Sequence, residues 1–271
     1  MSFLTSLPEP VSHLNHIHYM LIQKKPFTFI RFSDGETEII LNRKLEIYNG
    51  KTIFKGKKSK NIYPKFDNKK FDPRLHQSVR KDLISAATSR GEFLYKGLPS
   101  RHNRQLWERD LMLRLNGGLD KSITFSDLLI NSNYKTYRNN LVPLYRHFED
   151  IYVVANYRSV LIGELIKATL IPVQDNFFEN YDAVKSDIYE RIIDVPYGAL
   201  VLSSASSLTK IIGHLLYKKR PDITFIDIGT SINDLLSLKY NTRAYHNIFY
   251  SRDPFKLFFN KFINIGNKIK W

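Results

Sequence analysis

The chain has 271 residues, of which 43% are hydrophobic and 13% aromatic, which predicts a folded protein with a sizeable core and excludes a disordered chain. It has no cysteine, which excludes a disulfide framework and a thiolate metal site. The net charge of +15 predicts attraction to an anionic partner such as nucleic acid, anionic lipid or a phosphorylated substrate.

The N-terminal stretch MSFLTSLPEPVSHLNHIHYM lacks the basic region and apolar core of a secretory signal. No apolar run in the chain reaches the roughly 18 residues that suggest a membrane span. These two features predict a cytoplasmic protein.

Strand-like and helix-like segments then alternate along the chain. The predicted elements are a strand at 27–32, a helix from about Glu36, a helix at 71–89 with Leu75 on its apolar face, a strand at 92–99, a helix at 133–148 kinked at Pro143, a strand at 150–156, a helix at 159–169, a strand at 198–204, a helix at 206–219 and a strand at 222–229. Apolar strands separated by helices predict an α/β fold with a mostly parallel sheet and helices on both faces.

One domain over residues 1–252 is the simplest organisation. It contains a basic insertion at about 43–70, where ten lysines and arginines accompany Glu46 and Asp67. The tail at 253–271 is basic and amphipathic, with large apolar side chains at helical spacing: Phe255, Phe258, Phe259, Phe262, Ile265 and Ile269. This tail is predicted to lie on an anionic membrane surface, although it could instead dock on its own domain.

In such sheets, ligands bind beyond the carboxyl ends of the strands, and three segments lie there. The first contains Asp34 and Glu36, which can converge on one point if the chain turns at Gly35. Two adjacent carboxylates repel each other, and a divalent cation such as Mg²⁺ or Mn²⁺ would remove that cost. The alternative is helix capping by Asp34 with Glu36 in the first turn. Arg31, just before them, could pair with an acid or reach a phosphate.

The second segment delivers four serines, Ser203, Ser204, Ser206 and Ser207, to the start of a helix. Free backbone N–H groups and hydroxyls at such a position suit a phosphate, and an ordinary serine N-cap is the alternative. No glycine-rich dinucleotide fingerprint or P-loop accompanies them.

The third segment, TFIDIGTSINDLL, places Asp227 and Asp234 on either side of Gly229 and Ser231. An acid at a strand end can hold a ribose hydroxyl, approach a metal or accept a substrate proton. For a reaction that inverts configuration, Asp234 is the first candidate for the base and Asp227 the second. Capping of the next helix by Ser231 or Asn233 is the alternative.

The motifs FIRFSDGE and FIDIGTSIND resemble the two ends of the GT-D type glycosyltransferases, a group also described as DUF1792-like. The segments EFLYKGLP, FSDLLINSNY and IPVQDNFFENYD follow in a compatible order, so the resemblance spans roughly residues 20 to 250. Ser33 stands where the family often has glycine, and the turn Ser203–Ser207 stands where a glycine-containing turn is common.

The resemblance implies a Rossmann-like fold and a nucleotide-diphosphate sugar as donor. It also implies a divalent cation, Mn²⁺ or Mg²⁺, held through a D-x-E motif that corresponds to Asp34 and Glu36. The strand-end rule and the serine-rich helix start, independently of the resemblance, predict that the donor contacts Arg31, the four serines, Asp227, Gly229 and Ser231. The acceptor would be a cell-surface glycan, a glycoprotein or a lipid-linked glycan at the inner face of the cell membrane, as in polysaccharide biosynthesis.

Two other functions stay open from the residues. A metal-dependent phosphoesterase is one, although a two-metal hydrolase usually carries a cluster of His and Asp ligands. A non-enzymatic protein that binds polyanions or membrane surfaces through lysines 43–70 is the other. Nucleic acid is not favoured as the partner, because no aromatic or arginine readout motif is present.

Overall fold

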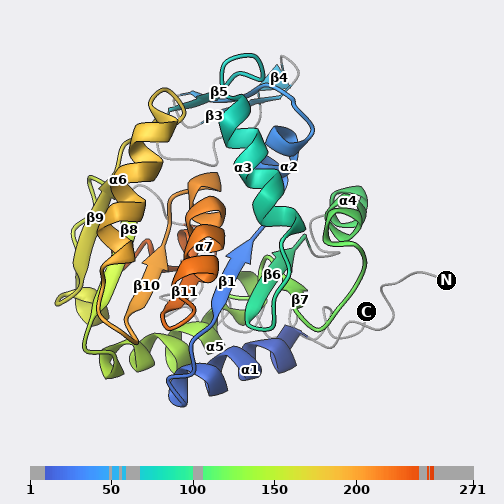
Figure 1. Ribbon diagram of the computed structural model, residues 1–271. Coiled ribbons are helices and arrows are strands. Elements are labelled where there is room, and N and C mark those ends of the chain that lie inside the picture. Colours follow the sequence, from blue (N-terminus) through green and yellow to red (C-terminus); the bar gives the residue numbers. More distant parts are fainter. Residues whose placement is uncertain are drawn as a thin grey trace, which may run out of the picture.

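A computed structural model describes residues 10–48, 51–54, 57–58, 68–99, 106–237, 243 and 245–246 (Figure 1). The tail at 253–271, with its predicted membrane contact, lies outside the described residues. In the described part of the chain, no helix combines the length and the apolar character needed to cross a lipid bilayer.

The centre of the fold is a seven-stranded sheet in the order β7-β6-β1-β11-β10-β8-β9, and every neighbouring pair in it is parallel. Its strands are β1 (Thr28–Arg31), β6 (Leu94–Leu98), β7 (Ile123–Phe125), β8 (Ile151–Asn156), β9 (Thr169–Val173), β10 (Leu200–Ser203) and β11 (Thr224–Asp227). The predicted α/β class with a parallel sheet is therefore confirmed. The chain order reverses at β1, which has β6 on one side and β11 on the other.

Helices cover both faces of this sheet. They are α1 (Pro10–Ile22), α2 (Asp34–Ile40), α3 (Gln77–Thr88), α4 (Leu106–Asn116), the short α5 (Tyr134–Thr136), α6 (Tyr181–Ile193) and α7 (Ser207–Lys219). Successive strand side chains point to opposite faces, so Phe29 joins the core beneath α1 while Ile30 joins the core beneath α3 and α7. Each face of the sheet therefore carries an apolar core covered by helices, as predicted.

A second, antiparallel sheet falls within the predicted basic insertion. It has the order β4-β3-β2-β5, with strands β2 (Leu45–Tyr48), β3 (Lys51–Phe54), β4 (Lys57–Lys58) and β5 (Lys69–Phe71). Leu45 and Ile47 turn their side chains inward. In Figure 1 this sheet lies above the ends toward which the arrows of β1 and β10 point, so it covers the carboxyl edge of the parallel sheet.

The predicted helix at 159–169 is wrong. That region contains one 3₁₀ turn, Gly163–Leu165, and then enters strand β9. The amides of Val160 and Ile162 donate to the carbonyls of Leu236 and Leu235, so they do not form the hydrogen bonds of a helix. Gly163 has a φ of +60°, which helical residues do not adopt.

Two other predicted helices differ in detail. Residues 131–147 form a 3₁₀ turn, α5, a π-helical turn (Tyr137–Leu141) and a 3₁₀ helix (Val142–His147), so the irregularity comes directly before and at Pro143. Helix α3 starts only at Gln77, because Asp72 folds the preceding residues into a turn and accepts the amide of Arg74. Leu75, predicted on the apolar face, is therefore 78% exposed.

Candidate functional site

A cavity of about 630 Å³ opens at the carboxyl edge of the parallel sheet, at the point where the strand order reverses. Its walls come from the β1–α2 turn, the β7 loop, the β10–α7 turn, the segment after β11 and the second sheet. The residues that line it include Arg31, Ser33, Asp34, Glu36, Leu45, Ile47, Lys69, Ser126, Asp127, Asn131, Ser204, Ser206, Ser207, Lys210, Asp227, Gly229, Thr230, Arg243 and Tyr245. The three segments predicted from the sequence thus meet at one cavity.

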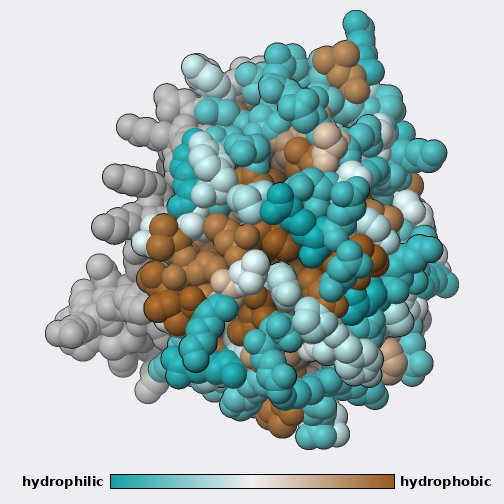
Figure 2. Space-filling model, turned by 60° about the vertical axis from the view of Figure 1, so that its left-hand side comes forward, coloured by the Kyte–Doolittle hydropathy of each residue, from teal (hydrophilic) through white to brown (hydrophobic). Residues whose placement is uncertain are grey.

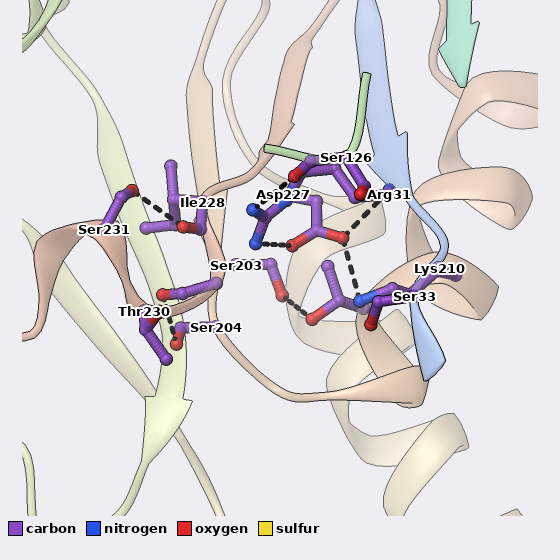
Figure 3. A network of polar contacts seen from close by, with 12 residues as sticks. Arg31, Ser33, Ser126, Ser203, Ser204, Lys210, Asp227, Ile228, Thr230 and Ser231 are labelled. Atoms are coloured by element: carbon purple, nitrogen blue, oxygen red, sulfur yellow. Dashed lines mark hydrogen bonds and ion pairs between the residues drawn. The ribbon is translucent and has the colours of Figure 1, made fainter. Parts of the chain in front are cut away.

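Part of the cavity wall is a group of four charged residues, Arg31, Glu36, Lys210 and Asp227, which we call the buried ion network. Figure 3 shows Arg31, Lys210 and Asp227 of this network. Asp227 is fully buried; it accepts the Arg31 backbone amide at 3.0 Å and pairs with the Arg31 guanidinium at 3.2 Å. Lys210 Nζ lies 2.9 Å from Asp227 and 3.5 Å from Glu36. Two cations and two anions therefore neutralise each other.

This network determines the protonation of Asp227. Burial by itself would raise the pKa of this carboxyl, but Lys210 and Arg31 hold the pKa below its ordinary value. An aspartate with a depressed pKa and two cationic partners is a weak proton acceptor. Of the two roles open for Arg31, the ion pair with an acid is the one that the structure contains.

Gly229 makes room for this arrangement. Its φ is +47°, and a Cβ atom at this position would collide with Nη2 of Arg31. The second guanidinium nitrogen, Nη1, donates to the carbonyl of Ser126 at 3.0 Å. The turn after β11 therefore needs glycine for two reasons, its backbone conformation and the closeness of Arg31.

Asp34 and Glu36 stand at the start of α2, with Ser33 as the N-cap residue. Glu36 reaches back to Ser33 and accepts both its amide (3.0 Å) and its hydroxyl (2.8 Å). Asp34 accepts the amide of Gly35 at 3.0 Å. The N-cap is thus one residue earlier than the capping alternative assumed, and both carboxylates still line the cavity.

The two carboxylates are close enough to affect each other. Burial first, and then the charge of Glu36, raise the pKa of Asp34. A cation between them would relieve this repulsion, so the oxygen donors fit Mg²⁺ or Mn²⁺. Among the described residues, no three His, Cys, Asp or Glu side chains are arranged to hold a metal on their own. Phosphate oxygens and water would have to complete the coordination.

Another part of the wall is the turn Ser204–Ser207, which we call the serine turn, and the first residues of α7. Ser206 has a φ of +55°, a strained value for a residue other than glycine. The hydroxyl of Thr209 organises the turn by accepting the Ala205 amide at 2.8 Å. Among the described residues, the buried hydroxyl of Ser207 has no hydrogen-bond partner. Together with the free N–H groups of the helix start, this hydroxyl can bind an anion.

The other predicted residues separate into two groups. Ser204 and Gly229 lie on the cavity wall and are joined by a hydrogen bond from the Ser204 hydroxyl to the Gly229 carbonyl at 2.7 Å. Ser203 and Ser231 are buried behind it, where Ser203 bonds Thr209 and Ser231 bonds the Ile228 carbonyl. These two hydroxyls hold the turns and are not on the wall.

Asp234 is not among the residues that line the cavity. It follows the 3₁₀ turn Gly229–Ile232, and its carboxylate pairs with Arg138 at 3.1 Å and contacts the Tyr134 hydroxyl at 3.4 Å. Asp234 therefore pairs with Arg138, in the helical layer on the α1 side of the sheet, and lies off the cavity wall.

Sequence reasoning missed several wall residues, among them Lys210 of the buried ion network. Asp127 and Asn131 come from the loop after β7, and Arg243 and Tyr245 come from the last described residues. The Tyr245 hydroxyl lies 2.6 Å from the Thr230 hydroxyl. For Asp127 a signal existed, because FSDLLINSN follows a short apolar strand. For Arg243 and Tyr245 no strand or motif marks the position.

A further carboxylate, Glu108 on α4, was also missed. Its side chain is buried, and Oε2 has no hydrogen-bond partner. Burial, followed by the charges of Asp34, Glu38 and Glu36, raises the pKa of Glu108 to about 7. The α2 region therefore carries more negative charge than the Asp34–Glu36 pair alone.

No family model and no curated protein matches this sequence. Three solved structures share its fold. The first, described as the selenomethionine-substituted structure of domain of unknown function 1792, is 16% identical with a TM-score of 0.53 and covers 85% of this chain and 82% of its own.

The second is described as a new glycosyltransferase (DUF1792) from Streptococcus sanguinis; it is 14% identical with a TM-score of 0.52 and covers 85% of both chains. The third, described as the highly conserved domain of unknown function 1792 with a distinct glycosyltransferase fold, is 14% identical with a TM-score of 0.51 and covers 87% of this chain and 88% of its own. The predicted likeness to DUF1792 domains is confirmed at the level of the fold.

Proposed function

We propose that this protein is a metal-dependent glycosyltransferase, which moves a sugar from a nucleotide-diphosphate donor to a glycan or glycoprotein acceptor. One observation carries the proposal: a single cavity holds the Asp34–Glu36 pair and the start of α7 with the unpartnered Ser207 hydroxyl. A diphosphate needs both, a cation on one side and hydrogen-bond donors on the other. The fold shared with structures described as glycosyltransferases supports this function.

The cavity is large enough for such a donor. Its volume of about 630 Å³ lies within the roughly 300–1,000 Å³ of ligand pockets. In the proposed arrangement, Ser206 and Ser207 bind the diphosphate. Tyr245, held by Thr230, offers an aromatic ring for the nucleoside.

Asp34 and Glu36 would hold the divalent cation. When bound, the cation neutralises negative charge that develops on the departing nucleotide diphosphate. Lys210 stays with Asp227 and Glu36, so it fixes the orientation of the Glu36 carboxylate. Asp227 acts in turn as a positioning residue for Arg31 and Lys210.

Asp127 is our candidate for the base of an inverting reaction. Four carboxylates line the cavity; Asp227 and Glu36 belong to the buried ion network, and Asp34 is assigned with Glu36 to the cation. Asp127 is the fourth, on the β7 loop. Asp234, the first choice from sequence, needs a rearrangement of its Arg138 pair to reach the cavity. Comparing Asp127→Asn with Asp234→Asn decides between them, and a retained anomeric configuration in the product, measured by NMR, would make a base unnecessary.

The net charge of the chain suits the proposed donor. Nucleotide-diphosphate sugars are anions, and the chain has a net charge of +15 that attracts them. A phosphoesterase is less well supported, because two-metal hydrolysis needs a larger ligand cluster than the described residues offer.

The test is a turnover screen of nucleotide sugars with Mn²⁺ and Mg²⁺. Asp34→Asn and Glu36→Gln should each lower metal-dependent turnover by about a hundredfold or more, on the scale of a lost charge-stabilising contact. Glu38→Gln is the matched control, since Glu38 lies on the same helix but pairs with Arg43 and does not line the cavity. Undiminished turnover in both cavity variants would refute the cation role.

A further inference from the structure

The segment Tyr157–Ile166, between β8 and β9, exposes a row of apolar side chains. Val160 is 61% exposed, Ile162 41% and Ile166 70%. Figure 2 brings the β9 edge of the molecule forward and shows apolar side chains gathered on this face, bordered by polar ones. We call Tyr157, Val160, Ile162 and Ile166 the apolar patch. Single exposed aliphatic residues are common, whereas a contiguous group on one segment marks an interaction site.

The segment is firmly attached to the domain. The Val160 and Ile162 amides bond to the Leu236 and Leu235 carbonyls at 3.0 Å each. Leu165 is fully buried and joins the core on the α1 side of the sheet. The outward direction of the patch is therefore fixed by backbone bonds and an inward anchor.

Three basic side chains accompany the patch. Lys167 follows it in the sequence and is exposed, and Arg146, in the 3₁₀ helix Val142–His147, pairs with Glu164 of the segment. Arg158 pairs with Asp175 and stacks on the Tyr157 ring at 4.2 Å. Aliphatic side chains next to Tyr, Arg and Lys are the composition that proteins present to the headgroup region of a bilayer.

The segment that carries the patch begins directly after Asn156, the last residue of β8, at the carboxyl edge of the parallel sheet where the cavity opens. A surface that contacts the start of this segment would therefore lie on the same edge of the sheet as the cavity.

We propose that the apolar patch docks the protein on an anionic lipid bilayer. The net charge of +15 and the exposed Lys167 beside the patch favour an anionic surface over a second, equally basic copy of the chain. If the proposed function holds, an acceptor carried by a membrane lipid would be presented to the cavity from this side.

Vesicle co-sedimentation of the full chain tests the proposal. The double variant Val160→Glu/Ile166→Glu places two carboxylates against the lipid and should weaken binding to phosphatidylglycerol-containing vesicles by about tenfold or more, or about 1.4 kcal/mol. Leu75→Glu is the matched control, because Leu75 is 78% exposed outside the patch and should bind like the wild type. Binding to pure phosphatidylcholine vesicles should be weaker throughout.

Three results would overturn the proposal. They are a wild type that does not bind anionic vesicles, a patch variant that binds as the wild type does, and a wild-type dimer in sedimentation velocity that the variant converts to monomer. A full-length Phe258→Glu/Phe262→Glu variant checks the tail: if it alone loses binding, the tail is the anchor. Metal-dependent turnover with a water-soluble acceptor should be unchanged in the patch variant, so failure here is separable from failure of the proposed activity.

Discussion

The buried ion network and the serine turn lie at the same cavity but use their polar groups differently. In the network, the charges of Arg31, Lys210 and Asp227 pair with each other within 3.2 Å, and only Nε of Arg31 lacks a hydrogen-bond partner among the described residues. In the serine turn, Ser206 keeps a strained backbone, and the buried Ser207 hydroxyl has no partner in the described part of the chain. Unsatisfied donors are costly in a folded protein, so their persistence beside a cavity points to a ligand.

This difference separates structural from ligand-binding residues. Arg31, Lys210 and Asp227 form ion pairs with one another and thereby fix the shape of the site. The Ser207 hydroxyl and the backbone amides at the start of α7, which are harder to recognise from sequence, remain available to bind a ligand. Variants of Arg31, Lys210 and Asp227 should therefore act on stability, and variants in the serine turn should act on ligand affinity.

The largest effect is expected for Asp227→Ala. Removing this carboxylate leaves Arg31 and Lys210 buried without their main anion, which typically costs about 3–5 kcal/mol. Urea unfolding should show this loss in the free energy of unfolding. Asp187→Ala is the control, because it breaks an exposed pair with Arg191 and should change stability by about 0.5 kcal/mol or less. Equal effects of the two variants would contradict the structural role of the network.

Gly229→Ala should have the next largest effect. The substitution combines an unfavourable φ with a collision against Arg31 and should destabilise by about 2–3 kcal/mol. Gly198→Ala isolates the backbone contribution, since Gly198 has a φ of +76° and no atom within 4 Å of the added Cβ; it should cost only about 1 kcal/mol. If both variants lose the same stability in urea, Arg31 does not constrain this turn.

The carboxylates near α2 predict a dependence of stability on pH. Glu108 has a folded-state pKa of about 7, above its ordinary value of 4.5. The folded protein therefore binds more protons than the unfolded chain between these values, and stability falls as the pH rises through this window. Glu108→Gln should remove that loss, making the variant more stable than the wild type at pH 8 by about 1–2 kcal/mol but not at pH 4. Urea unfolding at both pH values measures this difference in the free energy of unfolding. The same pH dependence of stability in Glu108→Gln and the wild type would contradict the prediction.

The smallest effect on stability is expected for Ser207→Ala. Its hydroxyl has no partner in the part of the chain that the structure describes, so its loss should change the free energy of unfolding by about 0.5 kcal/mol or less. Affinity for a nucleotide diphosphate should nevertheless fall about tenfold, the value of one hydrogen bond to a charged group. Ser203→Ala should do the reverse, because Ser203 bonds Thr209 behind the wall. Calorimetric titration and urea unfolding of both variants separate the two roles.

The sequence was most informative where burial is simple. Strands β1, β8, β10 and β11 are continuous apolar runs, and α7 has a clear apolar face, so the parallel sheet could be predicted. The segment at 159–169 has the same kind of apolar residues, but Leu235 and Leu236 supply its backbone partners from far along the chain. No local pattern distinguishes that outcome from a helix.

For the site, the sequence predicted the strand-end segments but not which side chains are used within them. Asp227 lies 196 positions from Arg31, and only their register in neighbouring strands brings them together. The 3₁₀ turn at Gly229–Ile232 directs Asp234 away from the cavity, and the spacing of residues in the sequence does not predict the direction of such a turn. Tyr245 reaches the cavity from a segment without a strand signal.

The most direct measurement is thermal unfolding with nucleoside diphosphates, each with and without Mn²⁺, for the wild type and Asp34→Asn. A diphosphate that binds this cavity with a cation should stabilise the wild type only when the metal is present, by about 2.7 kcal/mol at a hundredfold excess over its Kd. Asp34→Asn should lose that metal-dependent gain while unfolding normally without ligand. No stabilisation by any diphosphate, or an equal metal-dependent gain in Asp34→Asn, would contradict the proposal that this cavity binds the donor through a cation.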